Sequence, residues 1–370
     1  MLSVVGTGLA RSASGKLKHV GGCLLQSART LVQIQNKPYL PGSESPTFPK
    51  YLEEFRDDLP YRIQVADVKR ENLSVYAKEL RPILEKHIAE YGAVLIKGLP
   101  LSSAKDFSEF FNGLDLAPMD YVGGTGTRQQ VTQKVSTASD EPPEFSIEPH
   151  NEMSYLPYWP QLLFLYCHIP PEPGCGGESG ITDVRRVFKE LDNKVKEKII
   201  KKGLRYYRYF PDKSKADYTS WQESMMTESR EEAERIQKET NHQFRWEDDG
   251  ALTAWADRPA LAPHFRTGEM LWFNQAHSSN WTYFDYHPVL GDQHRGKPES
   301  KYPFTTAYAD DGTSIELDVL QHIREVSWRC TVGGQIQKSD VLILDNMLMQ
   351  HSRLSFTGVR KLMVALANYM

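Results

Sequence analysis

Three residues of this chain, two histidines and a glutamate, have the types and the spacing to bind one metal ion. His150 and Glu152 are separated by one residue, and His351 lies near the C-terminal end. Two imidazoles and one carboxylate can occupy one face of an iron(II) ion and leave the opposite face open. Of the 11 histidines, only His150 has an acidic residue two positions later. Because residues i and i+2 of a strand point to the same face, the spacing predicts that both side chains reach one ion.

A C-terminal block supplies the third ligand candidate and an arginine, Arg360. Residues 341–344, 347–351 and 361–367 are short apolar runs, and each is predicted to form a strand. On this pattern, His351 and Arg360 lie near facing ends of neighbouring strands. A guanidinium stays charged and binds a carboxylate through two parallel hydrogen bonds. Arg360 is therefore suited to hold a dicarboxylate beside the metal.

Five motifs follow one another along the chain. They are YGAVLIKGLP at 91–100, PHNEM at 149–153, CGGES at 175–179, LWFNQ at 271–275, and the block from Asp345-Asn346 through His351 to Arg360. In residue type and order they resemble the taurine dioxygenase and clavaminate synthase-like group of iron(II)- and 2-oxoglutarate-dependent oxygenases, over about residues 60–370.

The resemblance implies a role for each site residue. His150, Glu152 and His351 match the iron ligands, and Arg360 matches the arginine that binds the distal carboxylate of 2-oxoglutarate. Ser179 matches a position where the family often has Thr, whose hydroxyl can donate a hydrogen bond to that carboxylate. Related halogenases have a small residue in place of the carboxylate. Glu152 therefore implies hydroxylation or desaturation.

The resemblance also implies a reaction and a fold. Iron(II), 2-oxoglutarate and O2 would together oxidise a small, amino-acid-like substrate, with release of succinate and CO2. The fold would be a double-stranded β-helix, a jelly-roll of two facing sheets that is mainly β with peripheral helices (α+β). Helical periodicity at 75–91, 184–202 and 313–326, a possible Ser103 cap for 103–111, and a charged segment at 223–241 predict such helices.

The candidate substrate contacts are Tyr121, Arg128 and Asn274. Tyr121 and Arg128 lie in a turn-rich stretch before the metal triplet, where a loop over the site is expected, and Arg128 could hold a substrate carboxylate. Asn274 resembles a family position on the substrate side. An alternative substrate class is a trimethylammonium amino acid, as in the carnitine pathway, which an aromatic cage would suit.

Two alternatives lie outside the oxygenases. A zinc hydrolase with two His and one Glu also keeps an open metal position. Such enzymes usually carry His-Glu-x-x-His on a helix, which this sequence lacks. A non-catalytic metal-binding jelly-roll is the other alternative, because the fold alone does not decide function. A degenerate oxygenase would typically have lost a ligand or Arg360, and all are present here.

Composition gives no indication of a nucleic-acid or membrane partner, so the expected partner is a small-molecule substrate, and the sequence leaves the oligomeric state open. The net charge of −4 gives no indication of a nucleic-acid surface. No apolar run approaches the length needed to cross a membrane. The four cysteines show no Cys-x-x-Cys spacing, which is typical of a protein from a reducing compartment.

The first 43 residues differ from the rest because they contain no Asp or Glu, and the first acidic residue is Glu44. A basic, serine-bearing and acid-free N-terminus is typical of a mitochondrial transit peptide, and a disordered tail is the alternative. We therefore predict a transit peptide or tail over 1–43 and a single catalytic domain over 44–370, located in the mitochondrial matrix or otherwise in the cytoplasm. The basic residues are Arg11, Lys16, Lys18, Arg29 and Lys37.

Overall fold

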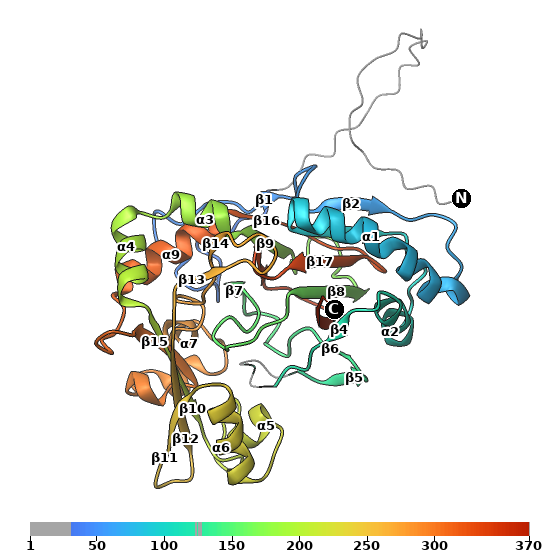
Figure 1. Cartoon of the computed structure of the whole chain (residues 1–370). Coiled ribbons are helices and arrows are strands. Elements are labelled where there is room, and N and C mark those ends of the chain that lie inside the picture. Colours follow the sequence, from blue (N-terminus) through green and yellow to red (C-terminus); the bar gives the residue numbers. More distant parts are fainter. Residues whose placement is uncertain (1–30, 123, 125–127, 370) are drawn as a thin grey trace.

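The structure is a computed structural model that describes residues 31–122, 124 and 128–369. Two large sheets share a hydrophobic core, and helices pack around them (Figure 1). This arrangement is the predicted double-stranded β-helix, an α+β fold that is mainly sheet. In these described ranges, no helix combines the length and apolar character needed to cross a bilayer.

The larger sheet has eight strands, and its central strands are buried on both faces. Along β8 (Leu162–Ile169), Leu163 and Leu165 belong to the core shared with the smaller sheet, whereas Phe164 and Tyr166 pack with α1 and α2. Burial on both faces explains why these strands are continuous apolar runs in the sequence. The spatial order is β2 (Tyr61–Gln64), β3 (Ala93–Lys97), β17 (Val341–Asp345), β8, β19 (Lys361–Asn368), β6 (Val135–Thr137) and β5 (Gln130–Thr132), with β4 (Ala117–Pro118) also paired to β19.

The smaller sheet carries the two histidines of the predicted metal site. Its strand β18 pairs antiparallel with both β7 and β9, which sets His351 directly opposite His150 on one side and Ile181 on the other. The spatial order is β1 (Glu53–Glu54), β16 (Thr331–Gly334), β9 (Ser179–Asp183), β18 (Met349–Arg353) and β7 (Ile147–His150).

The structure confirms the predicted helix end at Gly92 and the predicted helix start at Ser103. Two of the other predicted helices are each interrupted. Helix α1 ends at Gly92, whose φ of 72° is left-handed, and the Ser103 side chain caps α2 by accepting from the Asp106 N–H. The segments 184–202 and 223–241 each form two helices, because Asp192 starts a new cap and Met226 adopts a φ of 54°. The helices are α1 (Leu73–Tyr91), α2 (Ala104–Gly113), α3 (Val184–Glu190), α4 (Asn193–Lys202), α5 (Trp221–Met225), α6 (Arg230–Glu239), α7 (Thr282–Asp285), α8 (Gly291–His294) and α9 (Leu317–Arg329).

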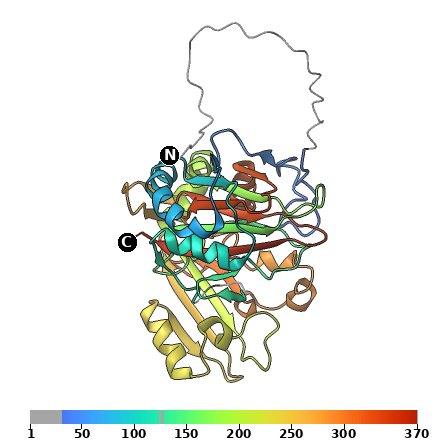
Figure 2. The same ribbon diagram turned by 90° about the vertical axis from the view of Figure 1, so that its right-hand side faces the viewer.

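A third sheet, which the sequence did not predict, forms a separate lobe with α5 and α6. Figure 1 shows this lobe below the two larger sheets, and Figure 2 shows it from the side. Its order is β11 (Gln243–Trp246), β12 (Leu252–Arg258), β10 (Leu204–Phe210) and β15 (Phe304–Tyr308), and a hairpin of β13 (Leu261–Pro263) and β14 (Met270–Trp272) follows β12 in the chain.

Part of the segment predicted to be a transit peptide or a tail packs against the body. Ile34 and Leu40 are fully buried against Trp328 and Leu354, so residues 31–43 belong to the folded body. The physical reason is burial of apolar side chains, and Lys37 is the only basic residue between 31 and 43. Residues 1–30, where most of the predicted transit peptide falls, lie outside the described residues.

Candidate metal centre and active site

The structure brings His150, Glu152 and His351 together. One ligand atom from each lies within 4.8 Å of the others. The His150 and His351 ring centroids are 4.1 Å apart, and His351 Nε2 is 3.7 Å from Glu152 Oε2. His150 ends β7, and His351 is the middle residue of β18. The pairing of these two strands therefore fixes the spacing of the two imidazoles.

Glu152 reaches the site by a different route from the predicted strand alternation. It lies in a turn after β7 has ended at His150, and the next residue, Met153, has a φ of 58°. The backbone of Glu152 is held instead by Asn346, whose amide accepts from the Glu152 N–H at 2.7 Å and donates to the Glu152 C=O at 2.9 Å. The i, i+2 spacing selected Glu152 correctly. The stated reason was wrong, because His150 and Glu152 do not lie on one face of a strand.

The histidines are in the form that binds a metal. His150 Nδ1 lies 2.8 Å from the backbone carbonyl of Glu148, so the proton is on Nδ1 and Nε2 is free. Burial lowers the pKa of His150 and lowers that of His351 well below its ordinary value, which keeps both rings neutral. Two neutral imidazoles and one carboxylate are a donor set that fits iron(II).

A buried ion pair anchors the strand that carries His150. Arg324 of α9 donates from Nε to Glu148 Oε1 at 2.5 Å and from Nη2 to the Thr282 hydroxyl at 3.1 Å. The Arg324 and Glu148 side chains are almost completely buried. Because the Glu148 carbonyl also orients His150, this pair links α9 to the geometry of the metal site.

Arg360 and Ser179 contact each other, and both line the cavity that His150, Glu152 and His351 also line. Arg360 Nη2 is 3.2 Å from Ser179 Oγ, and its Nε donates to the Gly177 carbonyl at 3.1 Å. Gly177 has a φ of 75°, and a Cβ there would lie 2.9 Å from Arg360 Cδ, so glycine is needed for this approach. Burial, together with the charge of Arg353, lowers the pKa of Arg360 to about 10.

The strands that follow each other at His351 and Arg360 lie in different sheets. His351 is in β18 of the smaller sheet, whereas Arg360 immediately precedes β19 of the larger sheet. Their side chains nevertheless line one cavity of about 110 Å³. The facing geometry of the jelly-roll brings the two strands together, because the loop between them crosses from one sheet to the other.

Two of the three candidate substrate residues line this cavity. Arg128 Nη2 bonds Glu152 Oε2 at 2.5 Å, and its guanidinium lies 3.9 Å from the centre of the Tyr121 ring. Burial opposes the charge of Arg128, but the Glu152 carboxylate together with Tyr121 and Tyr155 outweighs this effect and raises the pKa of Arg128. Asn274 is not among the lining residues. Its amide bonds the Ala260 carbonyl and the Ala276 N–H, which gives it a structural role in its loop.

Sequence reasoning missed most of the remaining cavity wall. Glu141 accepts from the Tyr218 hydroxyl at 2.8 Å, and its other oxygen lies 2.9 Å from His287 Nε2. The neighbour of Asn274, Gln275, lines the cavity and donates to the Asn151 carbonyl. Apart from Gln275, which ends the motif at 271–275, no pattern in the sequence marks these residues, because only the tertiary fold brings them together. The missed lining residues include Glu141, Tyr218, Ser278, Ser279 and Tyr283.

The fold and the site together define a mononuclear non-haem iron oxygenase of the jelly-roll type. The family model described as "Taurine catabolism dioxygenase TauD, TfdA family" matches residues 56–366, and the chain belongs to this family. It is accordingly a non-haem iron(II)- and 2-oxoglutarate-dependent dioxygenase, with O2 as the second co-substrate. The hydrolase and the non-catalytic alternatives do not agree with this membership.

Two curated relatives match about three quarters of the chain. A clavaminate synthase-like protein of Arabidopsis thaliana is 29% identical over 298 residues, covering 78% of this chain and 85% of the relative. The dapdiamide synthesis protein DdaC of Enterobacter agglomerans is 28% identical over 283 residues, covering 76% and 84%. The crystal structure of PvcB from Pseudomonas aeruginosa is similar with a TM-score of 0.47 and 13% identity, covering 88% and 93%. Because that score is below 0.5, the assignment rests on the family match and the site.

Proposed function

We propose that this dioxygenase hydroxylates or desaturates a small, amino-acid-like carboxylic acid. The observation that carries the proposal is Arg128. Its Nη2 is paired with Glu152, but its Nη1 is buried and has no hydrogen-bond partner among the described residues. A buried guanidinium with a free N–H in the cavity is suited to a carboxylate, which completes its hydrogen bonds.

The charges that line the cavity balance each other. Arg128, Arg353 and Arg360 are matched by Glu141, Glu148 and Glu152, and Arg324, which pairs with Glu148, is not itself a lining residue. Iron(II) and the 2-oxoglutarate dianion would also cancel each other when bound. An amino-acid-like zwitterion with its carboxylate at Arg128 would therefore leave no net charge in the buried site.

The residues of the chain divide the remaining tasks. Iron(II), 2-oxoglutarate and O2 supply the oxidising chemistry when bound, with succinate and CO2 as products of the co-substrate. His150, Glu152 and His351 would hold the metal, and Arg360 with Ser179 would hold the distal carboxylate of 2-oxoglutarate. The aromatic wall of the cavity excludes water from the substrate side.

A spectroscopic titration tests the assignment of the co-substrate site. We would add iron(II) and 2-oxoglutarate without oxygen to the full chain and record the weak visible charge-transfer band of the chelate. The band is expected in the wild type and is expected to be lost in His351→Ala. Arg360→Ala should need far more 2-oxoglutarate to develop it. Tight zinc retention without any band would contradict the assignment.

Succinate release tests the substrate class. We would screen small amino acids and related acids, each beside its carboxamide, and expect only the acids to stimulate succinate release. Arg128→Gln is expected to lower kcat/KM for the acid by about 10- to 150-fold, because a hydrogen bond to a charged group contributes about 1.5–3 kcal/mol. The charge-transfer band serves as the control for an intact metal site. Equal stimulation by acid and amide would exclude Arg128 as the carboxylate anchor.

One observation favours a trimethylammonium amino acid as a second candidate substrate. Tyr218, Tyr283 and Phe304 line the cavity beside the Glu141 carboxylate, and aromatic rings with a nearby anion suit a quaternary ammonium group. Including a trimethylammonium acid in the same screen separates the candidates. If the trimethylammonium acid is the substrate, Glu141→Gln should raise the KM for this acid more than the KM for its primary-amine counterpart.

We propose a mitochondrial matrix location on composition alone. The acid-free N-terminus carries Arg11, Lys16, Lys18 and Arg29, all outside the described residues. Residues 1–30 fused to a fluorescent protein should enter mitochondria, and the same segment with these four residues changed to Gln should not. Cytoplasmic fluorescence from the unchanged fusion would contradict the proposal.

A further inference from the structure

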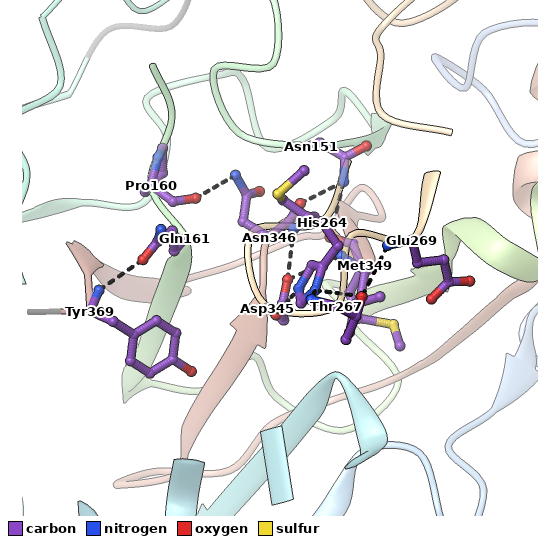
Figure 3. Close-up of polar contacts among 12 residues, drawn as sticks. Asn151, Pro160, Gln161, His264, Thr267, Glu269, Asp345, Asn346, Met349 and Tyr369 are labelled. Atoms are coloured by element: carbon purple, nitrogen blue, oxygen red, sulfur yellow. Dashed lines mark hydrogen bonds and ion pairs between the residues drawn. The ribbon is translucent and has the colours of Figure 1, made fainter. Parts of the chain in front are cut away.

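The turn between β17 and β18 contacts the backbone of two metal-binding segments. It consists of Asp345 and Asn346, both about 1% exposed, followed by Met347 and Leu348 before β18 begins at Met349. Figure 3 shows that Asn151, His264 and Asp345 gather around Asn346. His150 and Glu152 lie on either side of Asn151, and β18 carries His351. The turn therefore lies between the two sources of metal ligands.

The amide of Asn346 has all of its contacts with the segment that follows β7. Its Oδ1 accepts from the Glu152 N–H at 2.7 Å, and its Nδ2 donates to the carbonyls of Glu152 and Pro160, each at 2.9 Å. One acceptor and two donors are used in one plane, which among uncharged short side chains only Asn provides. Both backbone polar groups of Glu152 are thus bonded to one side chain.

The rest of the turn fixes the position of Asn346 itself. The Asn346 carbonyl accepts from Asn151 Nδ2 at 2.6 Å. Asp345 Oδ1 accepts from the N–H groups of Met347 and Leu348 at 2.9 and 3.1 Å, and Asp345 Oδ2 lies 3.0 Å from His264 Nε2 (Figure 3). The carboxylate therefore closes the turn that leads into β18. The position of Glu152 is tied in this way to the strand of His351.

We propose that Asn346 is a positioning residue, which fixes the Glu152 carboxylate against the two histidines before any metal binds. Glu152 needs such support because it follows the end of β7, and the pairing with β18 that aligns His150 and His351 does not extend to it. Arg128 contacts the end of the Glu152 side chain, whereas Asn346 fixes the backbone from which that side chain extends. The proposal rests on the assignment of Glu152 as a metal ligand. Without these two hydrogen bonds from Asn346, metal binding itself would have to order the Glu152 carboxylate. The free energy that this ordering costs would weaken metal binding.

Cobalt(II) binding to the otherwise unchanged full chain tests this proposal. Cobalt(II) reports both affinity and coordination geometry through its visible ligand-field spectrum. Asn346→Ala is expected to weaken cobalt(II) binding by about 10- to 100-fold, the usual effect of losing a group that orients a ligand. It is also expected to change the spectrum, which a purely structural role would leave unaltered.

Asn280 provides the matched control. It is 1% exposed, donates from Nδ2 to the Thr306 carbonyl and hydroxyl, and accepts from the Thr282 N–H, so its amide also makes three contacts. It does not line the metal cavity. Asn280→Ala should lower the melting temperature of the metal-free protein about as much as Asn346→Ala does, but leave the cobalt(II) affinity within about 3-fold of wild type.

Isosteric variants keep the test decisive if the alanine variants do not fold. Asn346→Asp retains the acceptor for the Glu152 N–H but sets a carboxylate oxygen against two carbonyls, so the same loss of cobalt(II) affinity is expected. Asn280→Asp is its control. Wild-type affinity and spectrum in Asn346→Asp, or an equal loss in Asn280→Asp, would overturn the proposal. Loss of cobalt(II) binding in Asn346→Asp together with retained binding in Glu152→Ala would instead contradict the ligand assignment on which it rests.

Discussion

At the residue scale, we expect the single side chain of Arg360 to determine much of the affinity for 2-oxoglutarate. Its guanidinium contacts Ser179 and the Gly177 carbonyl, and we propose that its remaining N–H groups bind the distal carboxylate of 2-oxoglutarate. Arg360→Lys is expected to raise the 2-oxoglutarate concentration needed for half-saturation by about 10- to 150-fold, because a lysine cannot copy the bidentate contact. Titration of the visible charge-transfer band would measure it. The adjacent, exposed Lys361, changed to Met, should have no such effect.

The burial of Arg360 also predicts a pH dependence of co-substrate binding. Its pKa is lowered to about 10, so the free protein keeps this charge at neutral pH and loses it as the pH rises through about 10. Calorimetric titration of 2-oxoglutarate into cobalt(II)-loaded protein should give a dissociation constant that increases above about pH 10. A constant value up to about pH 11 would contradict this expectation.

Residue types identified part of the site from the sequence. His150, Glu152, His351, Ser179 and Arg360 were all selected by type, spacing and resemblance, and the structure places all five around one cavity. Their specific roles in binding stay predictions. Asn274 was selected by motif position alone, and its amide bonds only to backbone groups. The amide that supports Glu152 could not be foreseen, because 194 residues separate it from that partner.

At the scale of elements, α9 and β7 depend on each other through Arg324 and Glu148. Arg324→Met leaves a buried carboxylate without its partner and is expected to lower the free energy of unfolding by about 3–5 kcal/mol. Urea denaturation would measure the loss. Arg329→Met, at an exposed position of the same helix, should change stability by less than about 0.5 kcal/mol.

The Arg324→Met variant should also recover stability at low pH. Burial raises the pKa of Glu148 even with Arg324 opposing it, so the folded state disfavours the ionised carboxylate. The protonated form carries no penalty of this kind. The destabilisation caused by Arg324→Met should therefore grow as the pH rises through the pKa that Glu148 has in the folded protein. It should diminish as the pH falls below that pKa. A loss that does not depend on pH would indicate lost packing instead.

Elements with strong periodicity or fixed caps were predictable, and breaks within them were not. The strands at 341–344 and 361–367 followed from apolar runs, since both faces of the larger sheet are buried. The single helix predicted over 184–202 is interrupted where Asp192 caps α4. The apolar i, i+4 pattern continues through that break, so periodicity alone could not reveal it.

At the scale of the whole molecule, the segment 31–43 is an integral part of the body. Leu40 is fully buried with Phe48, Trp328 and Leu354. Leu40→Ala is expected to lower the free energy of unfolding by about 2–5 kcal/mol. Leu31→Ala, at a side chain that is 55% exposed, is the matched control and should be nearly neutral. Equal effects in urea denaturation would show that the cluster contributes little.

The global architecture was predictable only through resemblance. The jelly-roll came from the order of five motifs, whereas the four-stranded lobe contains none of them. Its strand β10 pairs with β12 and β15, which are distant in the chain, and such pairings leave no local signal in a sequence. The sequence therefore predicted the part of the fold that carries the metal and missed the part attached to it.

The separation of the candidate ligands along the chain has a consequence for synthesis on the ribosome. Asn346, His351 and Arg360 emerge long after His150 and Glu152, and so do β17 and β19, which flank β8 in the larger sheet. A nascent chain that ends before Asp345 has His150 and Glu152 but lacks both the proposed third ligand and the proposed positioning residue. We therefore expect the complete metal site to form only after β18 has emerged, and products truncated before Asp345 to bind iron weakly.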